Sequence, residues 1–220
     1  MPLATFQHDD HLGEIVIDSP PQNLYSAQLL ADLRAAVDEA AGSDIRALLL
    51  RAEGDDFSAG AELAVFIGID EAQARELSST VLSLIRAIED LPVPTLALIH
   101  GQCYAGALET CLACDLIWAA EGSQIGQIEA VAGSITYAGG TQRIASRIGV
   151  GRAAEMVFTA AILPPEILAS WGLINRVVPA SSLTSALSLR PWRTAPLALT
   201  PRPSECSTLG ARAELPPPTP

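Results

Sequence analysis

Apolar side chains recur at helical spacing in two long stretches of the chain. After Ser26, leucine, alanine and valine residues return every three or four positions as far as Val37. This spacing predicts an amphipathic helix with Ser26 as its N-cap. A second helix is expected from Glu71 to Asp90, with Asp70 as its capping residue, and Pro92 prevents its continuation.

Short apolar runs alternate with these helices and predict β-strands. The expected strands lie near residues 3–7, 13–17, 47–51, 95–99, 115–119 and 173–178. Further helices are expected at about 104–113, 140–148 and 152–160, and in a short segment that ends at 171–172. Strands that alternate with helices through short glycine-bearing loops predict an α/β architecture.

The periodic pattern is lost after Pro179. Residues 181–220 hold eight of the sixteen prolines and four arginines against two acidic residues, and no apolar period persists there. We therefore expect a core domain over residues 1–180 and an irregular Pro/Arg-rich tail over 181–220. Disorder and a change of reading frame both remain open as explanations. A change of reading frame can be tested on the coding DNA, because this explanation requires one of the two alternative frames to encode an amphipathic helix.

Composition and charge exclude several classes of function. The formal net charge is -12, and all 13 basic residues are arginines. Nucleic acid and anionic lipid are unexpected partners, because binding to phosphates requires clustered positive charge. No apolar run reaches the length of a membrane span, and no basic start precedes an apolar stretch, so we expect a cytoplasmic protein. The four cysteines are too sparse for a disulfide framework, which favours a reducing compartment.

Two turns rich in small residues carry the candidate chemistry. Each turn, one ending at Ala61 and the other at Gly106, can expose a backbone N–H group to an oxyanion. Glu109 follows Gly106 by three residues, about one helical turn, so its carboxyl group can lie near the bound atom. Glu129 provides a second acid further along the chain. The two turns form one site only if the fold brings them together.

Five ordered motifs show a resemblance to a known family. Their residues are 57–61, 100–115, 126–129, 138–143 and 171–179. Over residues 3–180 the chain resembles the crotonase family, the enoyl-CoA hydratases and isomerases. The resemblance implies an α/β fold, a crotonase-like spiral of ββα units, in which the irregular Pro-rich tail replaces the usual C-terminal helical part. It also implies a homotrimer or hexamer.

The resemblance also implies roles for individual residues. The N–H groups of Ala61 and Gly106 would form an oxyanion hole for the thioester oxygen. Glu109 would activate a water for attack at C3, and Glu129 would deliver a proton to C2 of a 2-enoyl-CoA. Coenzyme A would enter as part of the substrate, with no other cofactor and no metal. Four further positions are expected to bind substrate: Ala59, Gly60, Gly133 and Tyr137.

Alternative interpretations remain open at this point. An enoyl-CoA isomerase of the same family, or a non-catalytic acyl-CoA-binding or assembly subunit, also fits the motifs. The chain departs from the family pattern at Glu62, where Asp is common, and at Thr136-Tyr137, where Pro-Gly is frequent. Arg143 could pair with an acid or with a CoA phosphate. Cys111 and Cys114 are expected to pack in the core.

Overall fold

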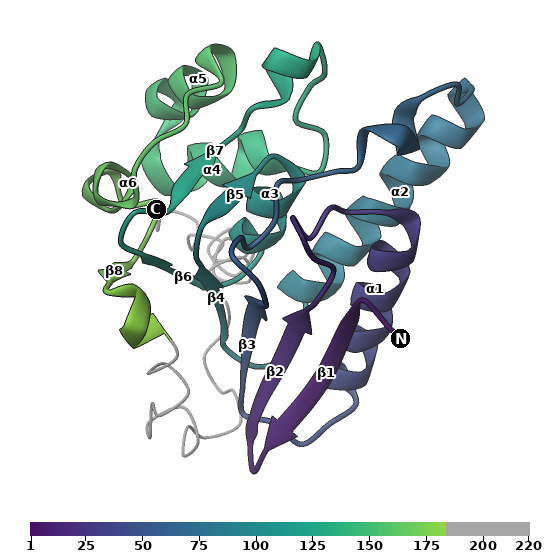
Figure 1. The fold of residues 1–220 in the computed structure, drawn as a ribbon, viewed down its shortest axis with the longest axis vertical. Coiled ribbons are helices and arrows are strands. Elements are labelled where there is room, and N and C mark those ends of the chain that lie inside the picture. The colour runs from purple at the N-terminus through teal and green to yellow at the C-terminus, as the bar shows by residue number, and fades with distance from the viewer. Residues whose placement is uncertain (184–220) are drawn as a thin grey trace, which may run out of the picture.

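A six-stranded sheet forms the centre of the protein (Figure 1). The structure is a computed structural model and describes residues 1–183. The order of the strands is β1-β2-β3-β4-β6-β8, in which β1 and β2 are antiparallel and all other neighbours are parallel. Their bounds are β1 Ala4–Asp9, β2 Leu12–Ile17, β3 Ala47–Ala52, β4 Thr95–Ile99, β6 Leu116–Ala120 and β8 Arg176–Val178.

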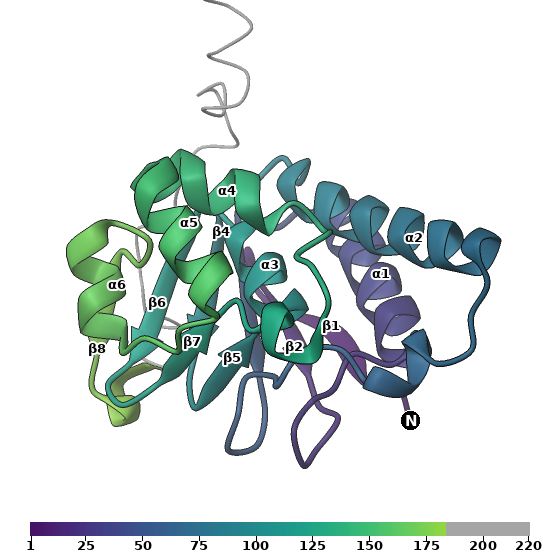
Figure 2. The same cartoon turned by 90° about the horizontal axis from the view of Figure 1, so that it is seen from above.

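Helices and a second, two-stranded sheet complete the fold. The helices are α1 Ala27–Ala41, α2 Glu71–Glu89, α3 Gly106–Leu112, α4 Gly140–Ile148, α5 Val150–Thr159 and α6 Pro165–Trp171. Two short 3-10 helices are η1 Leu63–Phe66 and η2 Glu129–Ala132. The small parallel sheet pairs β5 Gln102–Tyr104 with β7 Gln124–Gly126. In Figure 2, α1 lies against β1 and β2, and α2 lies along α1.

The two long helices form for the reasons that the sequence indicates. The Ser26 side chain accepts a hydrogen bond from the Leu29 N–H at the start of α1. Asp70 and Gln73 form a reciprocal capping box at the start of α2. Each helix buries one apolar face, as amphipathic helices in globular proteins do. In β3, Leu48 and Leu50 enter one core cluster and Leu49 another, because alternate residues point to opposite faces of a strand.

Two segments that follow neighbouring strands run side by side. The chain after β3 forms a parallel bridge with β5, in which Ser58 pairs with Cys103. The Ser58 N–H donates to the Gln102 carbonyl oxygen (3.0 Å), and the Tyr104 N–H donates to the Ser58 carbonyl oxygen (3.1 Å). Gly101 closes the turn before β5 with φ 54°, and a Cβ there would lie 2.1 Å from the Asp55 carbonyl oxygen. Only glycine fits this turn.

The elements match the sequence-based expectations except at short segments. The helix expected from residue 104 begins at Gly106, because residues 102–104 form β5. The strand expected over 173–178 covers only Arg176–Val178, since Leu173 and Ile174 are used in the hydrogen-bonded turn that ends α6. The tail predicted over 181–220 lies outside the described residues from position 184 onward.

Candidate active site

One apolar pocket contains most of the predicted site residues. It has a volume of about 760 Å³ and lies between η1, the start of α3 and η2. The predicted residues that line it are Ala59, Ala61, Gly106, Glu129, Gly133 and Tyr137. The two others do not line it: Gly60 is buried beside Ala105, which lines the pocket, and Glu109 is buried in α3, one helical turn after Gly106. The structure therefore gathers six of the eight predicted positions around one pocket.

Ala61 presents its N–H group on one side of an extended segment. A parallel bridge joins Tyr25 to Ala61: the Tyr25 N–H donates to the Gly60 carbonyl oxygen, and the Glu62 N–H donates to the Tyr25 carbonyl oxygen. Because successive peptide groups of a strand point in opposite directions, the Ala61 N–H faces away from Tyr25. No acceptor within residues 1–183 takes a hydrogen bond from it.

Gly106 presents a second unpaired N–H group as the first residue of α3. The preceding residue, Ala105, is the N-cap, and its carbonyl oxygen accepts the first helical bond, from the Glu109 N–H (3.0 Å). No side chain caps this helix. The first N–H groups of a helix have no partner within the helix and are available to a ligand.

The neighbours of these two donors are in direct contact. Ala61 and Gly106 each lie three residues beyond the bridge between Ser58 and Cys103, and both line the same pocket. A Cβ on Gly60 would lie 3.0 Å from the Tyr104 carbonyl oxygen and 3.3 Å from the Ala105 Cβ. The absence of a side chain at Gly60 thus allows the two segments to approach closely.

Ala105 adopts an unusual backbone conformation at this contact. Its φ of 52° and ψ of -125° lie in a region that residues with a Cβ rarely adopt. Its N–H donates to the Gly126 carbonyl oxygen (2.9 Å), which holds the residue in place. Strained backbone of this kind is concentrated at functional sites.

Glu109 is a buried acid held by backbone amides. Its side chain is 1% exposed, and Oε1 accepts a hydrogen bond from the Gly140 N–H (2.8 Å). Burial raises the pKa of Glu109 to about 7, and the charge of Glu129 adds to the increase, whereas the N–H groups of Gly140 and Ala138 oppose it. A carboxyl group with this pKa exchanges protons near neutral pH. Its second oxygen, Oε2, has no hydrogen bond of normal geometry to the described residues.

Glu129 begins η2 and is half-buried at the pocket. Burial raises its pKa, opposed by its own backbone N–H. Gln127 is fully buried. When its side-chain amide is oriented with the nitrogen towards the surrounding acceptors, this nitrogen lies 3.2 and 3.3 Å from the carboxylate oxygens of Glu129 and 3.2 Å from the Ala105 carbonyl oxygen. Sequence reasoning missed Gln127; a polar residue two positions before a candidate acid was the available signal.

Tyr137 and Phe66 form an aromatic wall of the pocket. Their rings meet edge to face, with centroids 6.3 Å apart and planes at 86°. Burial raises the pKa of Tyr137 to about 12, and the charges of Glu109 and Glu129 add to this increase. Tyr137 and Glu129 line the same pocket. Phe66 was not predicted, because a single exposed aromatic residue in a short 3-10 helix has no distinguishing pattern.

Arg143 pairs with an acid, one of the two partners that the sequence left open. Its Nε and Nη2 lie 2.7 and 2.6 Å from the two carboxylate oxygens of Glu89, and its Nη1 donates to the Ala138 carbonyl oxygen (2.8 Å). The pair connects the end of α2 to the first turn of α4, and the bond to Ala138 holds the segment before that helix. Gly140, the first residue of α4, supplies the N–H that binds Glu109, so Arg143 supports the part of the chain that holds this acid.

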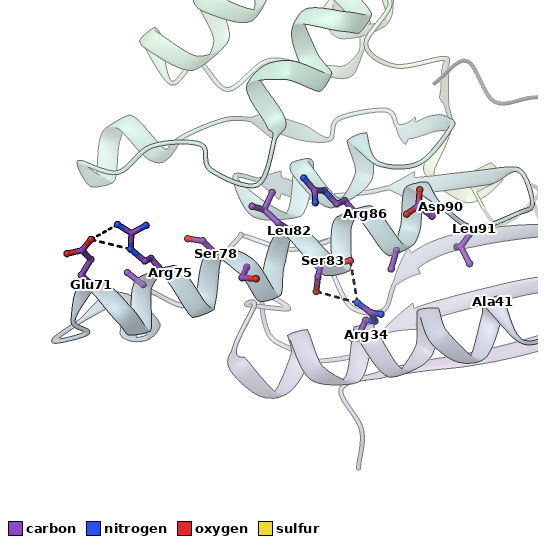
Figure 3. A pocket seen from close by; sticks show the side chains of 13 residues that line it. Arg34, Ala41, Glu71, Arg75, Ser78, Leu82, Ser83, Arg86, Asp90 and Leu91 are labelled. Carbon is purple, nitrogen blue, oxygen red and sulfur yellow. Dashed lines mark hydrogen bonds and ion pairs between the residues drawn. The ribbon is translucent and has the colours of Figure 1, made fainter. Parts of the chain in front are cut away.

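A larger hollow of about 980 Å³ lies elsewhere, along α1 and α2 (Figure 3). Its arginines have local partners: Arg75 pairs with Glu71, and Arg34 binds Ser83 as well as Asp38. None of the predicted site residues lines it. Among residues 1–183, no group of three or more His, Cys, Asp or Glu side chains is arranged to hold a metal ion, and no helix has the length and hydrophobicity needed to cross a membrane.

Comparison with known proteins places this arrangement in a family. The family model described as enoyl-CoA hydratase/isomerase matches residues 7–193. The chain belongs to the enoyl-CoA hydratase/isomerase family. Solved structures agree with this assignment, so the predicted crotonase-like α/β fold is confirmed. An enoyl-CoA hydratase from Bacillus anthracis superimposes with a TM-score of 0.80 at 32% identity, covering 84% of this chain and 74% of that one. DspI from Pseudomonas aeruginosa gives 0.81 at 31%, with coverages of 86% and 73%.

Curated relatives in this family differ in their named reactions. The enoyl-CoA isomerase/hydratase fer4 of Mycosarcoma maydis is 40% identical over 174 residues, which are 77% of this chain and 63% of that protein. The mitochondrial methylglutaconyl-CoA hydratase of Mus musculus is 37% identical over 160 residues, 71% of this chain and 51% of that protein. The chain thus spans between about half and two thirds of the length of these relatives.

Proposed function

We propose that this family member is an enoyl-CoA hydratase, which adds water across the 2,3 double bond of a 2-enoyl-CoA thioester. One observation carries the proposal: one apolar pocket is lined by two residues with unpaired backbone N–H groups and by Glu129, and a second acid of raised pKa, Glu109, lies one helical turn after Gly106. An enolate intermediate needs fixed donors at the thioester oxygen, and the addition of water needs an acid and a base at the adjacent carbons.

The two donors act on the oxygen that gains negative charge. When water attacks C3, electrons of the double bond move through C2 to the thioester oxygen, and the N–H groups of Ala61 and Gly106 stabilise this enolate. Loss of one such donor typically costs about 2.7–4 kcal/mol of transition-state stabilisation. The donors need no reorganisation during the reaction, because bridges and helix geometry fix both peptide groups.

The two acids divide the proton transfers. Glu109 takes a proton from water while the oxygen forms its bond to C3, and Glu129 then gives a proton to C2, which completes the addition. A pKa of about 7 suits Glu109 to act as a base near neutral pH. Gln127 donates to Glu129 and so holds its carboxyl group in place.

Names of relatives support the substrate class. Methylglutaconyl-CoA hydratase of Mus musculus and the isomerase/hydratase of Mycosarcoma maydis both act, by name, on unsaturated acyl-CoA thioesters. Isomerisation is the competing reaction. The two are distinguished by mass, because a hydrated product gains one water and an isomerised product does not.

The test is an assay of the purified chain with short trans-2-enoyl-CoAs, read by mass spectrometry. Glu109→Gln and Glu129→Gln should each lower the hydration rate by roughly 10²- to 10⁴-fold, since each removes one proton transfer. Binding of saturated butyryl-CoA should change little. The exposed Glu121→Gln is the control for loss of one negative charge. Unchanged turnover in both pocket variants would remove these acids from the mechanism.

A further inference from the structure

A second hollow lies behind the aromatic wall of the catalytic pocket. It has a volume of about 530 Å³ and lies between α2 and α4, whose lining side chains include Leu82 and Arg86 as well as the paired Glu89 and Arg143. Tyr137 lines both this hollow and the catalytic pocket, and no other described residue does so. Tyr137 is therefore the residue that the two spaces have in common.

The Tyr137 ring is held in its place on several sides. Phe66 contacts it edge to face, and the ring packs against the buried apolar core. The next residue, Ala138, is fixed through its carbonyl oxygen by Arg143, which is itself paired with Glu89. The ring is thus a built part of the wall, anchored to both α2 and η1.

Substrate geometry directs the acyl chain towards this ring. With the thioester oxygen at Ala61 and Gly106, C2 and C3 must lie at the two acids. The coenzyme part is large and charged, so it has to leave the apolar pocket towards solvent. The carbons beyond C3 then continue past the acids, and Tyr137 lines the same pocket as Glu129.

We propose that the Tyr137 ring closes the acyl end of the pocket and restricts the site to short acyl chains, and that its removal joins the pocket to the hollow between α2 and α4. This assignment depends on the proposed thioester position. It makes Tyr137 a residue that determines chain-length specificity, acting by its size and not by its hydroxyl group.

Binding of saturated acyl-CoAs tests the proposal without requiring turnover. Isothermal titration of the full chain would compare butyryl-CoA with dodecanoyl-CoA. The unsubstituted protein should show no preference for the longer ligand. Tyr137→Ala should bind dodecanoyl-CoA at least about tenfold more tightly than the unsubstituted protein does, because additional methylene groups then leave water. Its affinity for butyryl-CoA should change much less.

Two further variants separate ring size from other effects. Tyr137→Phe keeps the ring and should keep the original preference, whereas Tyr137→Ala combined with Ser146→Trp refills the hollow and should reverse the gain. Tyr137→Leu serves as a second truncation with an apolar side chain. The proposal would be overturned if both truncated variants, Tyr137→Ala and Tyr137→Leu, kept the chain-length preference of the unsubstituted protein. It would also be overturned if Tyr137→Phe changed this preference as much as they do.

The outcome is independent of the hydration assay. A shift in chain-length preference in a protein that adds no water would support the Tyr137 partition and reject the proposed reaction. Hydration of short enoyl-CoAs with no shift in Tyr137→Ala would do the reverse. Failure of both ligands to bind the unsubstituted protein would reject both proposals.

Discussion

Glu109 combines burial with an incomplete set of partners. One carboxyl oxygen is bound by the Gly140 N–H, and a Cβ on Gly140 would lie 2.8 Å from the Glu109 Cγ. Glycine at position 140 is therefore required for this approach. The backbone favours the ionised carboxylate while burial favours the neutral acid, and burial prevails. A group balanced in this way can both accept and hold a proton at physiological pH.

Stability should depend on pH through Glu109. Its pKa in the folded protein is about 7, above the ordinary value of 4.5, so the folded state binds the proton more tightly than the unfolded chain. The stabilising contribution is fully present below pH 4.5 and is lost as pH rises through 7, on the order of 3 kcal/mol in total. Glu109→Gln removes this dependence.

Urea unfolding at pH 5 and pH 8 measures this effect. The unsubstituted protein should lose on the order of 3 kcal/mol of unfolding free energy through Glu109 when the pH is raised from 5 to 8, and the Glu109→Gln variant should not show this loss. The exposed Glu121→Gln controls for a lost surface carboxyl group and should show no such gain. Parallel pH profiles for the Glu109→Gln variant and the unsubstituted protein would contradict the assignment of a raised pKa.

Ala105→Gly should stabilise the protein. Glycine relieves the strain of φ 52° and ψ -125°, of order 1–3 kcal/mol. It also adds about 0.5–1 kcal/mol of backbone entropy to the unfolded chain, so the net gain should be about 1 kcal/mol in a denaturant titration. The matched control is Ala107→Gly, inside α3, which should lose about 1 kcal/mol or more. Equal losses in both variants would argue against strain at Ala105.

At the scale of elements, the length of each helix or strand determined how well the sequence predicted it. The helices α1 and α2 were predicted because each repeats its apolar face over several turns and begins with a capping side chain. The strands β5 and β7 were not, because three residues carry no measurable period. Motif resemblance supplied the site residues, and helical spacing placed Glu109 near Gly106.

The proximity of the two turns could not be obtained from local pattern. It depends on the bridge between Ser58 and Cys103, which joins segments that lie far apart in the sequence. The same holds for Gln127 and for the Gly140 amide, whose partners come from other elements. The proposed roles of the site residues, the trimer or hexamer and the cytoplasmic location remain predictions.

The pair between Arg143 and Glu89 should stabilise the junction of α2 and α4. Its side chains are 17% and 39% exposed, so solvent screens the pair in part. A double-mutant cycle with Arg143→Met and Glu89→Met should give a coupling free energy on the order of 1 kcal/mol or more. The exposed pair of Arg75 and Glu71, at 78% and 80%, is the control and should give about 0.3–0.5 kcal/mol.

The same cycle carries a functional readout. Because Arg143 binds the Ala138 carbonyl oxygen, its loss should disturb the loop amides near Glu109 and lower the hydration rate. Substitution of Arg75 should leave the rate unchanged. Equal coupling in the two pairs, with no change in rate for Arg143→Met, would reduce this pair to an ordinary surface contact.

At the scale of the whole molecule, the larger of the two buried apolar clusters extends from α1 to α6. The same buried cluster includes Leu33 of α1, Leu50 of β3, Ile144 of α4 and Met156 of α5. No break in this cluster separates the end of the sheet near α1 from the helices near the pocket. Elements that share a continuous core generally unfold together.

We therefore expect a single cooperative unfolding transition. Leu33→Ala and Met156→Ala, at opposite ends of the core, should each cost about 2–5 kcal/mol of unfolding free energy. Helical circular dichroism and tryptophan fluorescence should give coincident curves in both variants. Separate midpoints for the two probes would show that the ends of the core unfold independently.

The N–H groups of Ala61 and Gly106 belong to the main chain, which limits how the site can be altered. Substitution of the side chains at these two positions leaves both N–H groups intact. Genetic drift at positions 61 and 106 can reshape the pocket while its electrostatic character persists. Replacement of the Ala61 amide by an ester, through chemical protein synthesis, would exchange this N–H group for an oxygen atom and leave every side chain as it is.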